Sequence, residues 1–164
     1  LNAIPLVMVA LAIITVLGVG FGTLLIVIVT TSVPTYARVI RAQTLALKSA
    51  DFILAERALG AGAIRIACVH ILPNVVSPLI VLASMDVPIV MMMEAGFSYL
   101  GLGVKPPDAS WGTILNDAFV ALDRAPWFVL IAGVPLVLAT LGFTFLGEGL
   151  RDLLDPRMRQ RGAL

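Results

Sequence analysis

Four apolar segments limit what this chain can fold into more than any other feature of its sequence. They cover residues 2–17, a run from Thr23 past Pro34, a run from Val75 to about Leu100, and a run from Trp127 to Gly147. An α-helix needs roughly 20 apolar residues to span the hydrocarbon core of a bilayer, so the first run is marginal and reads as a truncated span. With 60% hydrophobic and 13% charged residues, the 164-residue chain cannot bury these runs in one soluble core. We predict an all-α, polytopic transmembrane helical bundle with about four spans, forming one domain over residues 1–164.

Charged residues are clustered, and their clusters predict the topology. The segment between the second and third runs carries five basic residues against two acidic ones, and four arginines follow the fourth run: Arg38, Arg41, Lys48, Arg57 and Arg65, then Arg151, Arg157, Arg159 and Arg161. The positive-inside rule places both regions in the cytoplasm, and the two spans between them permit this. Residues 101–126 then form an extracytoplasmic loop, with Trp111 and Trp127 at interfacial positions, and residues 150–164 form a cytoplasmic tail.

Residues 48–73 form a charged, amphipathic insert between two apolar runs. Ser49 or Asp51 can cap a helix in which Phe52, Ala55 and Leu59 recur at helical spacing. Gly60 can end that helix in the left-handed conformation.

A second helical run, from Ala63 to His70, is expected to end where Pro73 can begin the next span. The insert therefore predicts a helix-turn-helix elbow on the cytoplasmic face. Such an elbow can lie in the lipid headgroups as an amphipathic connector, or it can bind in a groove of a soluble partner.

Several motifs along the chain carry a resemblance to a known family. They are Tyr36 to Gln43, Leu54-Ala55-Glu56 with Gly60 and Ile71-Leu72-Pro73, Phe97 to Pro107 with Ser110-Trp111-Gly112, and Gly147 to Asp152 with Leu154 to Arg157. In this order they resemble the binding-protein-dependent, type-I importer permeases of ABC transporters, in the dipeptide, oligopeptide and nickel branch. The resemblance covers nearly the whole chain. It implies the carboxy-terminal part of a permease, and since the sequence opens with Leu1 inside an apolar run, we expect the amino-terminal spans to be missing.

The resemblance also implies a mechanism and a set of partners. The elbow would be a coupling helix that sits in a groove of a cytoplasmic ABC ATPase, which binds the ATP and magnesium that this chain itself does not bind. The expected coupling residues are Phe52, Leu54, Ala55, Glu56, Arg57, Ala58, Leu59 and Gly60. A second permease subunit, as a heterodimer, and an extracytoplasmic solute-binding protein would complete a multi-pass importer of the bacterial or archaeal cytoplasmic (inner) membrane, with no nucleic acid involved. Its solute would be a di- or oligopeptide, nickel or a related small solute.

The elbow departs from the family signature at one point. Leu54 stands where the signature has its glutamate, and Glu56 stands where an alanine is usual. Two residues along an α-helix correspond to a rotation of about 200° around its axis, so Glu56 cannot present its carboxylate on the same face.

The sequence argues against an enzyme. Neither Lys48 nor Lys105 follows a glycine, so no phosphate-binding P-loop is present, and Gly18 to Gly22 reads as a tight hairpin between two spans. Cys68 and His70 are the only cysteine and histidine, which excludes a disulfide or a Cys/His metal cluster within this sequence. No catalytic residue is predicted. The alternatives are a non-transporting membrane scaffold or receptor subunit and an intramembrane protease, although the nearest protease-like sequence, Gly96 to Tyr99, lacks the final glycine.

Two acidic residues stand inside the third apolar run. An ionised side chain at mid-bilayer costs about 2.5–3.5 kcal/mol on insertion scales, so Asp86 and Glu94 are not expected to face lipid. Each is satisfied by a neighbouring helix, lies near an end of the span where the cost falls, or lines the substrate pathway. Met92, in the run of three methionines beside Glu94, is a third candidate for the pathway because methionine repacks easily, although such a run can also be ordinary packing.

Overall fold

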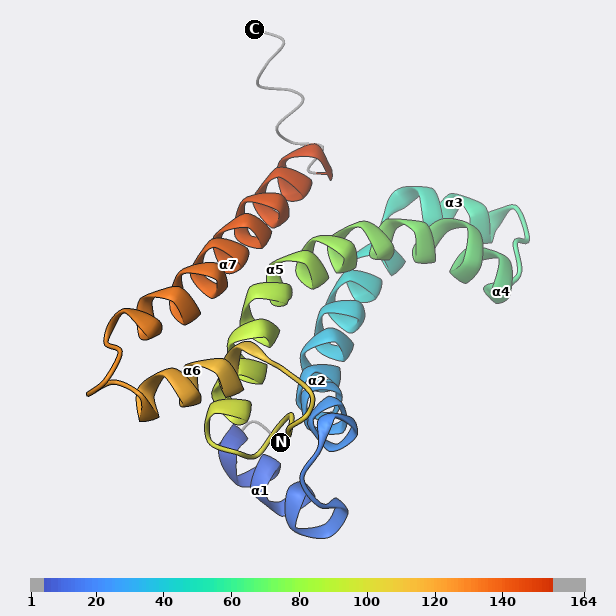
Figure 1. Ribbon diagram of the computed structural model, residues 1–164. Coiled ribbons are helices and arrows are strands. Elements are labelled where there is room, and N and C mark those ends of the chain that lie inside the picture. The colour runs from blue at the N-terminus through green and yellow to red at the C-terminus, as the bar shows by residue number, and fades with distance from the viewer. Residues whose placement is uncertain (1–4, 155–164) are drawn as a thin grey trace, which may run out of the picture.

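A computed structural model of the protein describes residues 5–154. Within this range the chain is helical and contains no strand, which confirms the predicted all-α class. The elements are α1 (Leu6–Leu17), α2 (Phe21–Lys48), α3 (Asp51–Ala58), α4 (Ala63–Arg65), the π-helix η1 (Ile66–Ile71), α5 (Leu72–Tyr99), α6 (Trp111–Val120) and α7 (Trp127–Leu154). Helix α5 is central, because α2, α6 and α7 all pack against it (Figure 1).

Three helices in the described part of the chain are long and apolar enough to cross a membrane. They are α2, the continuous helix Ala63–Tyr99, and α7. The first predicted span is only the 12-residue helix α1, which at 1.5 Å per residue is about 18 Å long, against a hydrocarbon core of about 30 Å. The expectation of about four spans is therefore corrected to three within residues 5–154.

The spanning helices extend beyond their apolar runs. Helix α2 continues through Arg38 and Arg41 to Lys48, and α7 continues past Gly147 to Leu154, so each has 28 residues. Neither extension contains a proline, and the α2 extension is rich in alanine, leucine and basic residues, which are good helix formers. Loss of hydrophobicity therefore marks where a helix leaves the apolar layer rather than where it stops.

The second arm of the elbow is continuous with the following span. The sequence predicted an end near His70 and a new helix at Pro73, but α4, η1 and α5 form one helix of 37 residues. The π-helical turn Ile66–Ile71 widens the helix just before Pro73, which lets the chain pass the proline ring without leaving the helix. The Asn74 side-chain amide donates a hydrogen bond to the His70 carbonyl at 2.7 Å, satisfying an acceptor in this irregular turn.

The two ends of the molecule differ in content. One end, the elbow end, holds α3 and α4, and the other, the loop end, holds α1, α6 and the connection between α5 and α6 (Figure 1). The carboxy-terminal end of α7 lies with the elbow end, because a pocket of about 500 Å³ there is lined by residues of α2, α5 and α7: Gln43, Asn74, Ser77, Pro78, Val81, Arg151 and Leu154. The predicted topology requires this arrangement. The assignment of the elbow end to the cytoplasm stays a prediction, and residues 155–164 of the predicted tail lie outside the described residues.

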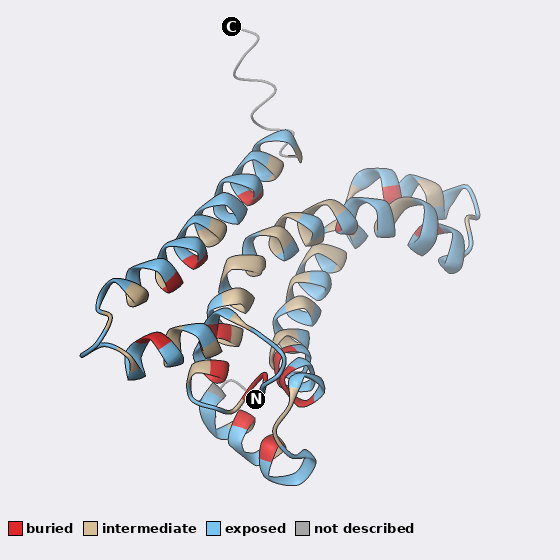
Figure 2. Ribbon diagram, viewed as in Figure 1, coloured by how far each residue is buried: buried red, intermediate tan, exposed pale blue. Residues whose placement is uncertain are grey.

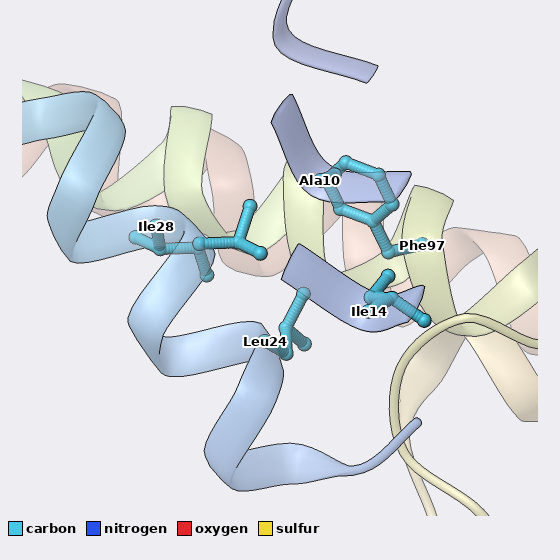
Figure 3. Close-up of a cluster of buried hydrophobic side chains, with 6 residues drawn as sticks. Ala10, Ile14, Leu24, Ile28 and Phe97 are labelled. Carbon is cyan, nitrogen blue, oxygen red and sulfur yellow. The ribbon is translucent and has the colours of Figure 1, made fainter. Parts of the chain in front are cut away.

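A small apolar core holds α1 against the loop end. Its buried members come from α1, α2 and the last part of α5: Ala10, Ile14, Leu24, Val27, Ile28 and Phe97. Figure 3 shows the Phe97 ring of α5 among the side chains of Ala10 and Ile14 of α1. Helix α1 is therefore fixed to the bundle although it is too short to span a bilayer.

Helix α6 interrupts the predicted extracytoplasmic loop 101–126. Its amino terminus is a capping box: the Thr113 backbone N–H donates to the Ser110 hydroxyl at 3.2 Å, and the Ser110 N–H donates to the Thr113 hydroxyl at 2.9 Å. Gly112 packs against α5, where a Cβ would clash with the Ala95 carbonyl and the Ser98 side chain. The loop is thus a folded cap on α5.

Most of the spanning surface is exposed and apolar. Figure 2 shows buried residues as isolated patches, and α7 buries only Ala132, Leu136 and Gly147. Its exposed side chains include Leu130, Ile131 and Leu138. Apolar faces of this extent require lipid or other membrane helices as their surroundings.

Candidate functional site

The elbow is the element that the sequence singled out, and its turn is built on Gly60. Gly60 has φ +84°, in the left-handed region that glycine adopts readily. Its N–H donates to the Arg57 carbonyl at 3.0 Å, and the Ala61 N–H donates to the Glu56 carbonyl at 3.0 Å. These two bonds form a Schellman motif, so the predicted glycine stop of α3 is confirmed.

The start of α3 differs from the prediction. Neither Ser49 nor Asp51 caps it: Ala50 occupies the N-cap position, and no side chain bonds to the helix end. Because α2 runs to Lys48, the Ser49 hydroxyl closes that helix instead, donating to the Ala46 carbonyl at 3.1 Å. Asp51 lies in the first turn of α3, where a negative charge is favourable to the helix dipole.

The inner face of the elbow is formed by other residues than the apolar ones that the sequence analysis noted. Phe52, Ala55 and Leu59, which recur at helical spacing, are all exposed. Ile53 is the buried residue of α3, with 0% exposed, and Ile66 is the buried residue on the opposite arm. Burial is decided by the direction in which α3 folds back on α2 and η1, which helical spacing alone does not reveal.

The elbow carries a group of large apolar side chains that are exposed. Phe52, Leu54, Leu59 and Ile64 are all exposed, Leu59 at 85%. We call this group the elbow tip surface. Arg57 is exposed beside it, as are Ala55 and Ala58. Seven of the eight predicted coupling residues, Gly60 among them, are thus exposed.

Glu56 is the exception, and its position explains the departure from the signature. Its Oε1 lies 3.4 Å from Nε2 of His70 on η1, and both side chains are partly buried. Leu54, where the signature places its glutamate, is half-exposed on the elbow tip surface. The carboxylate of this chain therefore faces inward across the elbow, as the rotation of about 200° between positions 54 and 56 requires.

Asp86 has a partner on a neighbouring span. The side chain of Tyr36 on α2 lies beside its carboxylate, close enough to interact with it. Both residues stand near the middle of their 28-residue helices. The sequence left open whether Asp86 is satisfied by a neighbour or lines a pathway, and the structure supplies the neighbour; the pathway role stays a prediction.

Glu94 belongs to a network at the loop end. The Ser98 hydroxyl donates to its Oε1 at 2.7 Å and accepts the Val104 N–H at 3.0 Å. Ser98 is only 2% exposed, and the Asn116 amide donates to the neighbouring Tyr99 carbonyl at 2.9 Å. The network ties the connection after α5 back onto α5.

Met92 lies elsewhere. It is exposed on α5 and lines an open apolar groove with Pro88, Ile89 and Met93. The described part of the structure therefore does not gather Asp86, Met92 and Glu94 around one cavity, and their pathway role stays a prediction. No group of three or more histidine, cysteine or acidic side chains able to hold a metal occurs within residues 5–154.

These features define a polytopic, helical membrane protein with a structured elbow at one end and a folded cap at the other. Its sequence belongs to the family described as binding-protein-dependent transport system inner membrane component, which matches residues 1–160. The resemblance predicted from the motifs is confirmed, as is the multi-pass location in the inner membrane.

Relatives of this chain are named as permeases of peptide transport. It is 42% identical over 156 residues to a putative peptide permease protein of Brucella ovis, covering 94% of this chain. It is 38% identical over 157 residues, or 96% of the chain, to the di/tripeptide transport system permease protein of Pseudomonas aeruginosa. It is also 38% identical over 159 residues, or 97% of the chain, to the glutathione transport system permease protein of Salmonella paratyphi A. In each case the match covers 52% of the relative, so the chain spans about half the length of these proteins.

Proposed function

We propose that this chain forms part of the transmembrane subunit of an ATP-driven importer for di- or oligopeptides or a related small solute. Family membership and the names of the relatives support the peptide class, since they include peptide, di/tripeptide and glutathione permeases. The subunit moves its solute by alternating access, and a separate cytoplasmic ATPase binds ATP and magnesium. A second permease subunit forms the other half of the pathway, and a solute-binding protein docks at the loop end.

The elbow tip surface is the observation that carries this proposal. Four large apolar side chains are exposed on a short, well-terminated helical hairpin beyond the ends of two spans. Exposed apolar groups of this kind mark a protein or membrane contact. An amphipathic helix binds in a groove of a soluble partner by placing such side chains in the pockets of that groove. The exposed side chains of the elbow are therefore suited to dock on the ATPase.

The inner structure of the elbow suits force transfer. Helix α3 is joined to α2 by only two residues, Ser49 and Ala50, and it packs against both α2 and η1. Since η1 continues into α5, a displacement of α3 by the ATPase acts directly on two spans. Phe52 to Gly60 are accordingly the proposed coupling residues, with Glu56 acting from the inner face.

Gly60 offers a direct test. In the full-length permease reconstituted with its ATPase and binding protein, we expect Gly60→Val to lower binding-protein-stimulated ATP hydrolysis at least tenfold. A β-branched side chain at φ +84° is strained, and it distorts the turn that presents the elbow tip surface. The matched control is Gly62→Ala, two residues away, where φ is −68° and a Cβ meets nothing within 4 Å.

Two results would contradict the proposal. Unchanged stimulated hydrolysis in a correctly inserted Gly60→Val protein would remove the elbow from the coupling pathway. A wild-type protein that binds no ATPase at all would instead favour the non-transporting scaffold.

A further inference from the structure

The pair formed by Glu56 and His70 is the feature of the elbow that the proposed function does not yet use. The two residues stand on different arms, Glu56 on α3 and His70 on η1, and 3.4 Å separates Oε1 from Nε2. Nε2 is buried and has no hydrogen-bond partner in the described structure. It therefore sits beside a carboxylate without a well-formed hydrogen bond to it.

The protonation state of the imidazole decides what this contact contributes. In a neutral imidazole only one ring nitrogen carries a proton, so Nε2 either donates or presents a lone pair toward the carboxylate. In the imidazolium both nitrogens donate, and a positive charge faces the negative one. Histidine side chains change charge between about pH 5 and 8. Protonation of His70 therefore strengthens the attraction between the two arms.

Other charged and titratable groups lie on the elements that pack against η1. They are Tyr36, Arg38, Arg41 and Lys48 of α2, Asp51 and Arg57 of α3, Arg65 of α4, and Asp86, Glu94 and Tyr99 of α5, with Cys68 on η1 itself. The basic groups, Asp51 and Cys68 are exposed, and Tyr36 lies beside Asp86, away from the elbow. Glu56 is the acidic group within ion-pair distance of His70.

The contact spans the joint through which α3 acts on α5. Helix α3 packs against η1 and α2 with Ile53 buried, and Glu56 of α3 approaches His70 of η1. A firm link fixes the angle at which α3 presents the elbow tip surface, whereas a loose one lets α3 shift against η1. The free energy of docking then includes the cost of ordering this joint.

We propose that Glu56 and His70 form a proton-sensitive brace that sets the position of α3, so that the elbow binds its ATPase more tightly at lower cytoplasmic pH. The inference rests on the proposed function, in which α3 is the docking helix. Both residues are positioning residues, because they act through the orientation of α3 and not by direct contact with the partner.

The test measures binding of the fluorescently labelled ATPase to the full-length permease complex in nanodiscs at pH 6 and pH 8. For a partly exposed ion pair, we expect the wild type to bind about two- to fivefold more tightly at pH 6. Glu56→Gln and His70→Gln should each bind with nearly equal affinity at the two pH values. The double variant should be no weaker than either single variant, because both remove the same contact.

Asp51→Asn is the matched control, since it removes an exposed carboxylate from the same helix without touching His70. It should keep the wild-type pH response. A Glu56→Gln protein that retains the full response, or a double variant whose losses add, would overturn the brace while leaving ATPase docking intact. Absence of wild-type binding at both pH values would instead refute the docking function itself.

Discussion

Helices α3 and α5 end in the same way, but the chain that follows each of them does something different. Gly60 and Gly101 both adopt a positive φ, and each is followed by a residue whose N–H bonds back across the last turn: Ala61 to Glu56, and Leu102 to Phe97. After Gly101 the chain folds back onto its own helix, and Ser98, Asn116 and the α6 capping box hold it there.

After Gly60 the described residues show no comparable set of hydrogen bonds between the two arms. The elbow tip surface remains exposed, and the polar link between the arms that these residues show is the 3.4 Å approach of His70 to Glu56, beside limited apolar burial. The same helix terminator therefore serves a closed structure at the loop end and an open one at the elbow end. Substitutions at the loop end should therefore lower the stability of the protein, whereas substitutions at the elbow end should lower its affinity for the partner.

The largest expected effect lies at the loop end. Gly112→Val places a branched side chain against the Ala95 carbonyl and Ser98, and overpacking of this kind should destabilise the protein by about 3 kcal/mol or more. Thermal unfolding of the full-length protein in detergent measures the loss. Gly142→Ala is the control, because a Cβ there meets nothing within 4 Å. Equal unfolding midpoints for the two variants would show that α6 is not tightly packed on α5.

Ser98→Ala should have a smaller effect of the same kind. It leaves the Val104 N–H without its acceptor and Glu94 without its donor, and burying an unsatisfied group costs about 1–3 kcal/mol. Ser84→Ala on the same helix is the control, since the Ser84 hydroxyl bonds only to the Val81 carbonyl within its own helix. If both variants unfold at the wild-type temperature, the network does not hold the loop end closed.

The smallest stability effect is expected at the elbow. Leu59→Ser removes an apolar side chain that is 85% exposed, so stability should change by less than about 0.5 kcal/mol. Affinity for the ATPase should nevertheless fall about fivefold or more, as for a contact residue in an interface.

The control for this variant comes from the other end of the molecule. Val120→Ser changes a side chain of α6 that is 78% exposed, and it should leave both stability and ATPase affinity unchanged. Pull-down or fluorescence titration with the ATPase measures the affinity of both variants. If Val120→Ser loses as much affinity as Leu59→Ser, the elbow tip surface is not the docking site.

Features that depend on a few neighbouring residues were predicted correctly. The apolar runs located α2, α5 and α7, and Gly60 located the turn of the elbow, because hydrophobicity and a left-handed stop act within a few residues. The predicted cap of α3 and the predicted helix break before Pro73 were wrong. A two-residue turn before α3 and a π-helical turn before Pro73 override the usual capping and proline rules. Helix α6 was overlooked although Ser110 and Thr113 carry a capping signal.

Contacts between residues that are far apart in the chain were not predicted from the sequence. Tyr36 and Asp86 are 50 positions apart, and Glu56 meets His70 only because the elbow folds back at Gly60. The burial of Ile53 rather than Phe52 likewise depends on how α3 lies against its neighbours. Such contacts depend on tertiary packing, which periodicity along one helix does not encode.

The unbroken helix Ala63–Tyr99 gives the molecule a mechanical property. Its 37 residues correspond to about 55 Å at 1.5 Å per residue, well over the roughly 30 Å of a hydrocarbon core. His70 stands near one end of this helix, Ser98 near the other, and Asp86, beside Tyr36 of α2, stands between them. The helix is continuous but not straight: α5, which contains Pro78 and Pro88, bends along its length (Figure 1), so a displacement at the elbow end reaches the loop end through a curved helix that can also flex at its prolines.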